Sequence, residues 1–234
     1  MSMFGNFEVD EKLAVGDNIG GGALPSGAYD FMVDMAYVGK SPPKDNGTDG
    51  EAMYVAFTFK AQDGATLKQN VYISSGKKKG CKNTYVSKSG AKFYLPGFEV
   101  VNDICIVATG VDLLNTDTEV KTVKVYDKEA SKELPTKVEV VTSLLGKTVT
   151  LGVIRVDEPD YLDNSKRRII NDINKVFNSD TKLTVKEITE EETEPKFYTK
   201  WVEKNQGKDK VKGAKSKGNG AAGTVKPAAS LFNS

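Results

Sequence analysis

The chain has 234 residues, of which 38% are hydrophobic and 28% are charged, a composition typical of one folded domain with a possible tail. Lysine and arginine total 33 against 32 acidic residues, so the net charge of +1 indicates no class of partner. The sequence contains no histidine, which excludes Ser-His-Asp and Cys-His catalysis and every metal site that needs an imidazole ligand.

The two cysteines, Cys81 and Cys105, are 24 residues apart in a spacing that matches no metal-binding motif. We expect free thiols, because a chain of this length needs no disulfide to hold its core. The N-terminal residues lack the pattern of a signal peptide, and no run approaches the roughly 18 apolar residues of a membrane helix. A soluble intracellular protein without a membrane partner is therefore expected.

Three strands are predicted in the first third of the chain, each from apolar residues that alternate with polar ones. The side chains expected to be buried are Tyr29, Phe31, Val33, Met35 and Tyr37 in the first strand, Met53, Val55, Phe57 and Phe59 in the second, and Leu67, Val71 and Ile73 in the third. This alternation leaves Lys68, Asn70 and Tyr72 together on the opposite face of the third strand.

One helix is predicted from Pro96 to Gly110, since proline suits a first helical turn and glycine ends helices. Further elements are expected as strands at residues 119–126, 136–142 and 147–156, a helical or irregular segment at 166–177, and a helix at 191–203. Three strands, a helix and more strands is the order of a small Greek-key barrel of the OB type. The predicted class is all-β or mainly β: an OB-like Greek-key barrel with one inserted helix, an extra C-terminal helical segment and a disordered tail.

Composition divides the chain into a flexible N-terminal arm (residues 1–23), an OB-type domain (24–200) and a disordered basic tail (201–234). Residues 204–226 hold seven lysines against one acid, Asp209, and too few apolar residues to build a core. Such a tail is either a solubility linker or a mobile element for nonspecific contacts with DNA.

Residues 64–98 are the most informative segment, because they contain seven lysines, interleaved aromatic residues and no acidic residue. Lysines neutralise phosphates and aromatic rings stack on unpaired bases, so this mixture favours single-stranded nucleic acid. The alternative is a solvated basic loop whose aromatics belong to the core. The candidate contact residues are Lys68, Tyr72, Lys77, Lys78, Lys79, Lys82, Tyr85, Lys88, Lys92, Phe93 and Tyr94. Tyr72 is the best supported, since it shares a strand face with Lys68.

Other charged runs give weaker signals. Lys166-Arg167-Arg168 is interpreted as part of a capped surface helix, or else as a patch that follows a nucleic-acid backbone. The acidic runs Asp157-Glu158-Pro159-Asp160 and Glu190-Glu191-Glu192 suit a solvated surface better than a divalent-metal site. Gly20-Gly21-Gly22 lacks the rest of a P-loop and is interpreted as a linker. No catalytic constellation is found, so neither enzymatic activity nor a cofactor is expected.

Several segments, taken in order between residues 24 and 210, make the chain similar to the OB-fold single-stranded DNA-binding proteins of tailed bacteriophages. They are Leu24–Tyr29, Gly76–Gly80, Leu95–Phe98, Asn171–Phe177 and Phe197–Asn205. The resemblance implies cofactor-free protection of unwound DNA during phage replication or recombination in the cytoplasm of the infected host, alongside replication or recombination enzymes. Related proteins carry an acidic tail that recruits those enzymes, whereas this tail is basic and only Leu231-Phe232 matches its apolar end.

Two other function classes stay open at this stage. The first is a structural or assembly protein of a virion that self-associates and contacts DNA nonspecifically. The second is a nuclease that uses the acidic runs with Mg²⁺.

Overall fold

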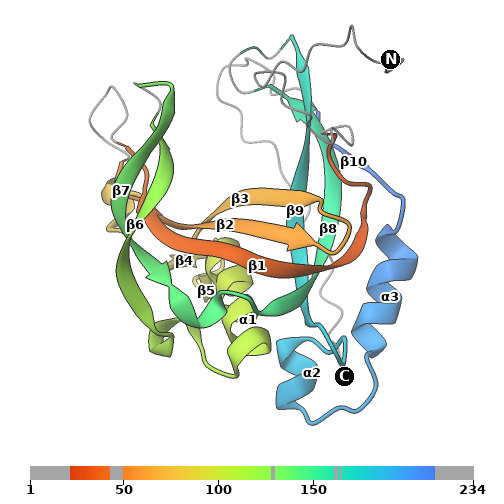
Figure 1. Ribbon diagram of the computed structural model, residues 1–234. Helices are drawn as coiled ribbons and strands as arrows, with labels where there is room; N and C mark the ends of the chain where they lie inside the picture. The colour runs from red at the N-terminus through yellow and green to blue at the C-terminus, as the bar shows by residue number, and fades with distance from the viewer. Residues whose placement is uncertain (1–21, 43–49, 128–129, 161–162, 164, 214–234) are drawn as a thin grey trace, which may run out of the picture.

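A meander of three antiparallel strands, β1 (Gly27–Lys40), β2 (Met53–Ala61) and β3 (Thr66–Tyr72), forms the centre of the molecule (Figure 1). The computed structural model describes residues 22–42, 50–127, 130–160, 163 and 165–213. All three strands were predicted from the period-two pattern. The inner face of the meander packs on the core, and its other face, called the outer face below, is open.

Two long hairpins extend the sheet beyond β1 and rise on either side of the outer face (Figure 1). The first half of β1 pairs with β8 (Thr148–Pro159), which pairs in turn with β9 (Arg167–Asn178). The end of β1 pairs with β7 (Lys132–Val141), which pairs with β6 (Thr118–Asp127). Together with the short β10 (Lys210–Val211), these strands form one eight-stranded, largely antiparallel sheet in which β3, β6, β9 and β10 each have only one strand neighbour within the described ranges. The mainly β class is confirmed, and the sheet is not closed.

Helix α1 (Pro96–Thr109) packs across the inner face of the meander and has the predicted ends. Gly110 ends it in the left-handed conformation, at φ 77°. Its buried side chains are Phe98, Val101, Ile104, Cys105 and Val107, and the last four share one core cluster with Phe31, Val33, Phe57, Phe59 and Val71 of the sheet. Burying each large apolar side chain contributes about 1.5–3 kcal/mol relative to leaving it in water, so this layer is the main core.

Shorter elements connect these parts. A 3-10 turn, η1 (Lys77–Lys79), precedes a small separate hairpin of β4 (Thr84–Val86) and β5 (Lys92–Tyr94). The turns η2 (Leu113–Asn115) and η3 (Thr142–Leu144) follow α1 and β7. No helix in the described ranges is long and apolar enough to cross a membrane.

A β-bulge in β1 overturns one part of the sequence interpretation. The register of β1 against β2 shifts between Val33 and Met35. Before the bulge, Phe31 and Val33 are fully buried as predicted, whereas beyond it Ala36 is the fully buried residue. The extra residue at the bulge moves Met35 and Tyr37 to the outer face, so the prediction that these two side chains share the buried face of Phe31 is wrong.

The fold continues past the predicted domain boundary. After α2 (Val185–Thr189), helix α3 (Lys196–Asn205) packs on β8 and β9. The short strand β10 (Lys210–Val211) then pairs with β8. Trp201 of α3 is only 5% exposed and packs against Ile154, Val156 and Phe177. The ordered fold therefore extends to residue 213, and a tail beginning at residue 201 is wrong. Residues 214–234 and the first 21 residues of the arm lie outside the described ranges.

The segment predicted to be helical or irregular at residues 166–177 is strand β9. Its basic cluster faces the first acidic run across the hairpin: Arg167 Nε lies 2.7 Å from Asp157, and Arg168 lies 2.5 Å from Glu158. The capped surface helix proposed for this cluster is therefore wrong. Because these charges compensate each other, the cluster does not present a free patch for phosphates.

An ion pair between β1 and the loop that follows β9 should make the free energy of unfolding depend on pH. Lys182 Nζ lies 2.6 Å from Asp30 and 2.9 Å from Thr150 Oγ1, and Thr150 also donates to Asp30. Burial raises the pKa of Asp30, but the hydrogen bonds from Lys182 and Thr150 outweigh it and hold the pKa below its ordinary value. The stabilisation is therefore present above the unfolded-state pKa of about 4 and is lost as the pH falls through the folded pKa.

We expect Asp30→Asn to lower the free energy of unfolding by about 0.5–1 kcal/mol at pH 7, because the pair is partly exposed. At pH 2 the difference between the variant and the unmodified chain should be smaller, because protonation of Asp30 removes the ion pair. Urea denaturation at the two pH values measures both differences. An equal loss at both values would assign the effect to packing instead of charge.

Candidate nucleic-acid interface

The outer face of the meander carries a row of tyrosines. Gly39, Tyr54 and Tyr72 lie opposite one another on the three neighbouring strands, and Tyr37 is two residues before Gly39 on the same face. The rings of Tyr54 and Tyr72 meet edge to face with centroids 5.5 Å apart. Tyr72 is 49% exposed and Tyr54 is half-buried, so the row presents aromatic surface to solvent.

Gly39 makes room for this arrangement. A Cβ atom at residue 39 would lie 2.4 Å from the ring of Tyr54, which therefore packs directly over the glycine backbone.

We expect Gly39→Ala to push the Tyr54 ring out of the row, because that contact is far below van der Waals distance. Near-UV circular dichroism should report the changed tyrosine environment, while the far-UV spectrum stays as in the unmodified chain. Gly213→Ala is the control for the loss of a glycine, since nothing lies within 4 Å of a Cβ there and its φ is outside the left-handed region. An unchanged near-UV spectrum for Gly39→Ala would contradict the packing.

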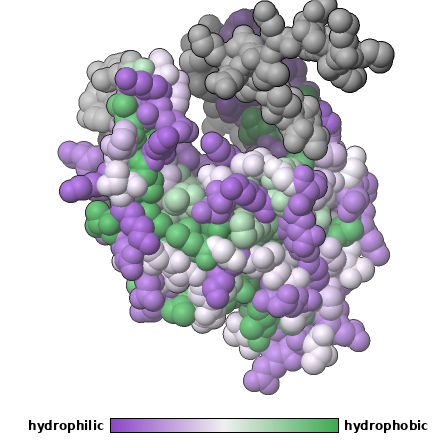
Figure 2. All heavy atoms as spheres, viewed as in Figure 1, coloured by the Kyte–Doolittle hydropathy of each residue, from purple (hydrophilic) through white to green (hydrophobic). Residues whose placement is uncertain are grey.

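Cations and polar groups flank the tyrosines on the outer face. Lys68 and Asn70 precede Tyr72 on the same side of β3, and both are exposed. Lys60 of β2 forms an ion pair of 2.9 Å with Asp34, the residue at the bulge. The face thus combines rings with lysines, and Figure 2 shows the surface notched beside the β6–β7 hairpin that borders it.

The hydroxyls of Tyr37 and Tyr54 on this face are neutral at physiological pH. Burial raises the pKa of Tyr54, and the nearby Tyr72 raises it further. Burial also raises the pKa of Tyr37, followed by the charges of Tyr54 and Glu133. Neutral phenols add no negative charge, so they can stack on bases without repelling phosphates.

The predicted basic loop is held against the end of the sheet. The amide of Ser75 donates to the carbonyl of Lys82, and the amide of Lys82 donates to Ser75 Oγ. Lys77 lies 3.1 Å from Glu51, so its charge is partly compensated. A groove of about 1240 Å³ runs beneath this loop and the β4–β5 hairpin. The predicted site residues that line it are Tyr72, Lys79, Lys82, Tyr85 and Lys92.

The aromatics of the hairpin form two further pairs. Tyr85 and Phe93 lie opposite each other on β4 and β5, with ring centroids 5.8 Å apart. Tyr94 stacks on Phe98 of α1 at 4.9 Å. About half of the surface of each of Tyr85, Phe93 and Tyr94 is exposed, so these rings do not belong to the core.

All eleven predicted site residues are exposed. The structure does not bring all of them together: Lys68 lies on the outer face, and Lys88 lies in the turn of the β4–β5 hairpin, away from the groove lining. Sequence reasoning missed Tyr54 and Lys60, although both have the opposite parity to the buried Val55 and Phe57. It also missed Tyr37, because no pattern in β1 reveals the bulge.

The described ranges hold no group of three or more side chains that could bind a metal ion. Both cysteines are free, as predicted: Cys81 is exposed and Cys105 is buried. Burial raises the pKa of Cys105 to about 11, so its thiol is not a nucleophile at neutral pH. The exposed rings and lysines of the outer face and of the groove beneath the basic loop offer stacking and charge neutralisation. No protein-family model, curated protein or solved structure matches this chain.

Proposed function

We propose that this protein binds single-stranded DNA without strong sequence preference and protects unwound strands during phage DNA replication or recombination in the host cytoplasm. The observation that carries the proposal is the row of Tyr37, Tyr54 and Tyr72 on a face that also holds Lys60 and Lys68. Stacking on aromatic rings tolerates every base, and lysines on phosphates add affinity without sequence choice.

The topology supports an OB-like assignment within this proposal. The strand order β3-β2-β1-β8-β9 places α1 between the third strand of the meander and the strand that returns to β1. This is the order of a five-stranded OB barrel, with the β4–β5 and β6–β7 hairpins as insertions. OB domains bind oligonucleotides on the face of their second and third strands, which here carry Tyr54, Lys60, Lys68 and Tyr72.

Binding to a duplex is disfavoured by the same geometry. Reading a major groove needs an exposed helix or ribbon with basic residues. Helix α1 is packed into the core and contains no lysine or arginine, and α3 is held on β8 and β9 through Trp201. Unpaired bases, in contrast, can reach rings that are half exposed on an open sheet.

The test is fluorescence anisotropy of a labelled oligo-dT of about 30 nucleotides, competed with unlabelled duplex at several salt concentrations. We expect tight binding that duplex does not displace. If about four phosphates are engaged, log affinity should fall with log salt at a slope near −3, from about 0.7 per phosphate. Equal competition by duplex, or affinity independent of salt, would overturn the proposal.

A second candidate, a self-associating assembly protein of a virion, is favoured by one observation. Val120 and Tyr126 on the β6–β7 hairpin are 68% and 60% exposed, and β6 has no second strand neighbour in the described ranges. Exposed apolar edges of this kind are sites of strand pairing between chains. Light scattering across a concentration series would favour this candidate if oligomers form while single-stranded DNA is bound no better than duplex.

A further inference from the structure

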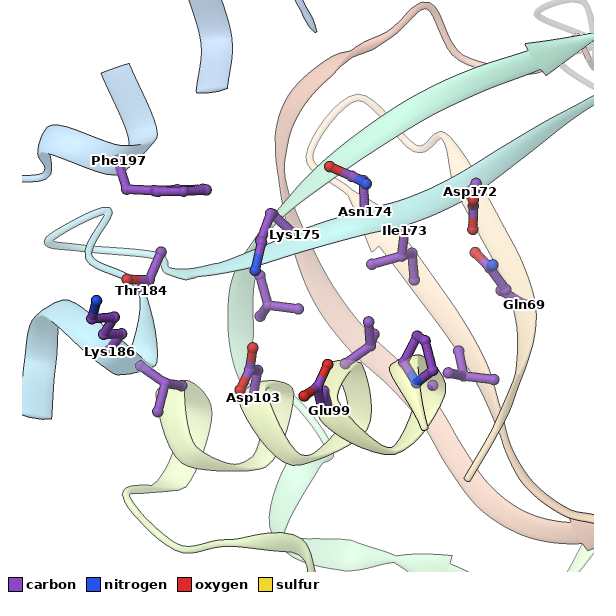
Figure 3. Close-up of a pocket in the computed structure, with 16 residues that line it drawn as sticks. Gln69, Glu99, Asp103, Asp172, Ile173, Asn174, Lys175, Thr184, Lys186 and Phe197 are labelled. Atoms are coloured by element: carbon purple, nitrogen blue, oxygen red, sulfur yellow. The ribbon is translucent and has the colours of Figure 1, made fainter. Parts of the chain in front are cut away.

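A second cavity, of about 610 Å³, opens between β3 and β9, each of which has a strand neighbour on one side only in the described ranges. We call it the seam groove. Helix α1 forms one wall with Glu99 and Asp103, and α2 and α3 close one end with Lys186 and Phe197 (Figure 3). Val71, Val100, Ile173, Val176 and Val185 add apolar lining. The groove lies on the core side of β3, whereas the tyrosine row lies on the outer face.

The seam groove contains acidic groups without ionic partners. Glu99 and Asp103 are one helical turn apart and, in Figure 3, project from α1 into the cavity, while Asp172 stands on β9 above them. None of the three carboxylates has a salt bridge within the described ranges. Burial raises the pKa of Asp103 to about 6, although Lys175 acts in the opposite direction. Lys175 and Lys186 also line the groove, so three carboxylates stand against two ammonium groups there.

A buried side-chain amide oxygen without a hydrogen bond also belongs to the seam groove. Gln69 Oε1 is buried and accepts no hydrogen bond, and Gln69 lines the seam groove beside Asp172 (Figure 3). A buried acceptor without a donor costs about 1–3 kcal/mol, so such atoms are rare in folded proteins. The groove thus has a free acceptor, free carboxylates and two open strand edges, all of which suit an extended segment with N–H donors and ammonium groups.

The chain itself contains a segment of this chemistry. Residues 214–234 carry Lys215, Lys217 and Lys226 and no acidic residue, and they end near the apolar pair Leu231-Phe232. These 21 residues span about 70 Å when extended, whereas a domain of this size has a radius of gyration of about 17 Å. The segment is therefore long enough to reach the groove from Gly213.

We propose that residues 214–234 dock in an extended conformation in the seam groove of the same chain, with their lysines on Glu99, Asp103 and Asp172. Strand addition to an open sheet edge supplies main-chain hydrogen bonds, and alternate side chains enter the lining. Charge complementarity selects this segment over the rest of the chain, which is acidic overall. The inference does not rest on DNA binding, because the groove and the tyrosine row are on different faces.

Zero-length carbodiimide cross-linking of the full chain tests the docking directly, because it joins an ammonium to a carboxylate only when the two are in contact. Peptide mass spectrometry should find Lys215, Lys217 or Lys226 joined mainly to Glu99, Asp103 and Asp172. At 0.5 M NaCl these cross-links should fall by at least about tenfold, because salt screens exposed charges beyond a few ångströms. Cross-links spread evenly over exposed carboxylates, or none from these lysines, would overturn the proposal.

Two matched variants sharpen the result. The triple variant Glu99→Gln, Asp103→Asn, Asp172→Asn should redirect the tail lysines to other carboxylates. The control Glu139→Gln, Asp63→Asn, Asp180→Asn removes the same number of charges at exposed positions and should leave the seam cross-links unchanged. Equal results for the two variants would contradict docking. Mixing ¹⁵N-labelled with unlabelled chains shows whether the tail comes from the same chain or from a second copy. If every cross-link joined a labelled to an unlabelled peptide, a second copy would supply the tail, and docking within one chain would be overturned.

Discussion

Trp201→Ala is expected to lower the free energy of unfolding by about 3–5 kcal/mol, the usual cost of truncating a buried aromatic residue. The Trp201 ring lies against Gly152, where a Cβ atom would come within 2.8 Å of it, and Nε1 donates to Asn174 Oδ1 at 2.8 Å. Removing the ring leaves a cavity between α3 and the β8–β9 hairpin and an amide without its donor. Urea denaturation, followed by far-UV circular dichroism, measures the loss.

Two further variants test whether this helix belongs to the fold. Phe197→Ala removes a residue of the same helix that is 42% exposed, so it should cost clearly less than Trp201→Ala. Gly152→Val should approach the effect of Trp201→Ala, because the added side chain would occupy the space of the ring. A loss below about 1 kcal/mol for Trp201→Ala would instead place residues beyond 200 outside the cooperative unit.

Tyr54→Ala and Tyr72→Ala are each expected to weaken binding of single-stranded DNA by about 1–3 kcal/mol, which is about 5-fold to 150-fold in Kd. Tyr72 is half exposed and supports no core, so its removal should leave the free energy of unfolding nearly unchanged. The two rings contact each other, so the double variant should lose less than the sum of the two single losses. Anisotropy titration at fixed salt gives the affinities, and this prediction rests on the proposed function.

Tyr126→Ala is the matched control for the tyrosine row. Tyr126 is 60% exposed on β6, a strand that pairs with β7 and not with the strands that carry the tyrosine row. Its removal should change the affinity less than twofold. Equal losses of affinity for all three variants would mean that any exposed aromatic ring contributes to binding. That result would contradict a specific role for the tyrosine row.

Local sequence patterns determined most of the secondary structure of this protein. Period-two alternation identified β2 and β3, strands were also expected at the positions of β6, β7 and β8, and Pro96 and Gly110 bounded α1, because such signals are local and need no distant partner. The same alternation placed Lys68 and Tyr72 together on an exposed face. The exposure of the lysines between residues 64 and 98 was also predictable from the sequence, because a charged ammonium group is more stable in water than in a protein interior.

Only the tertiary structure decided the features that depend on partners far along the chain. β1 pairs with β2, β7 and β8, and the bulge after Val33 in its pairing with β2 turned Tyr37 to the outer face. Residues 167–178 became a strand because β8 offers an edge, although their apolar spacing also suits a helix. The burial of Trp201 required the space over Gly152, and the unpaired acids of the seam groove became neighbours only when α1 spanned β3 and β9. Each of these outcomes depends on contacts between residues distant in sequence, which a local pattern does not contain.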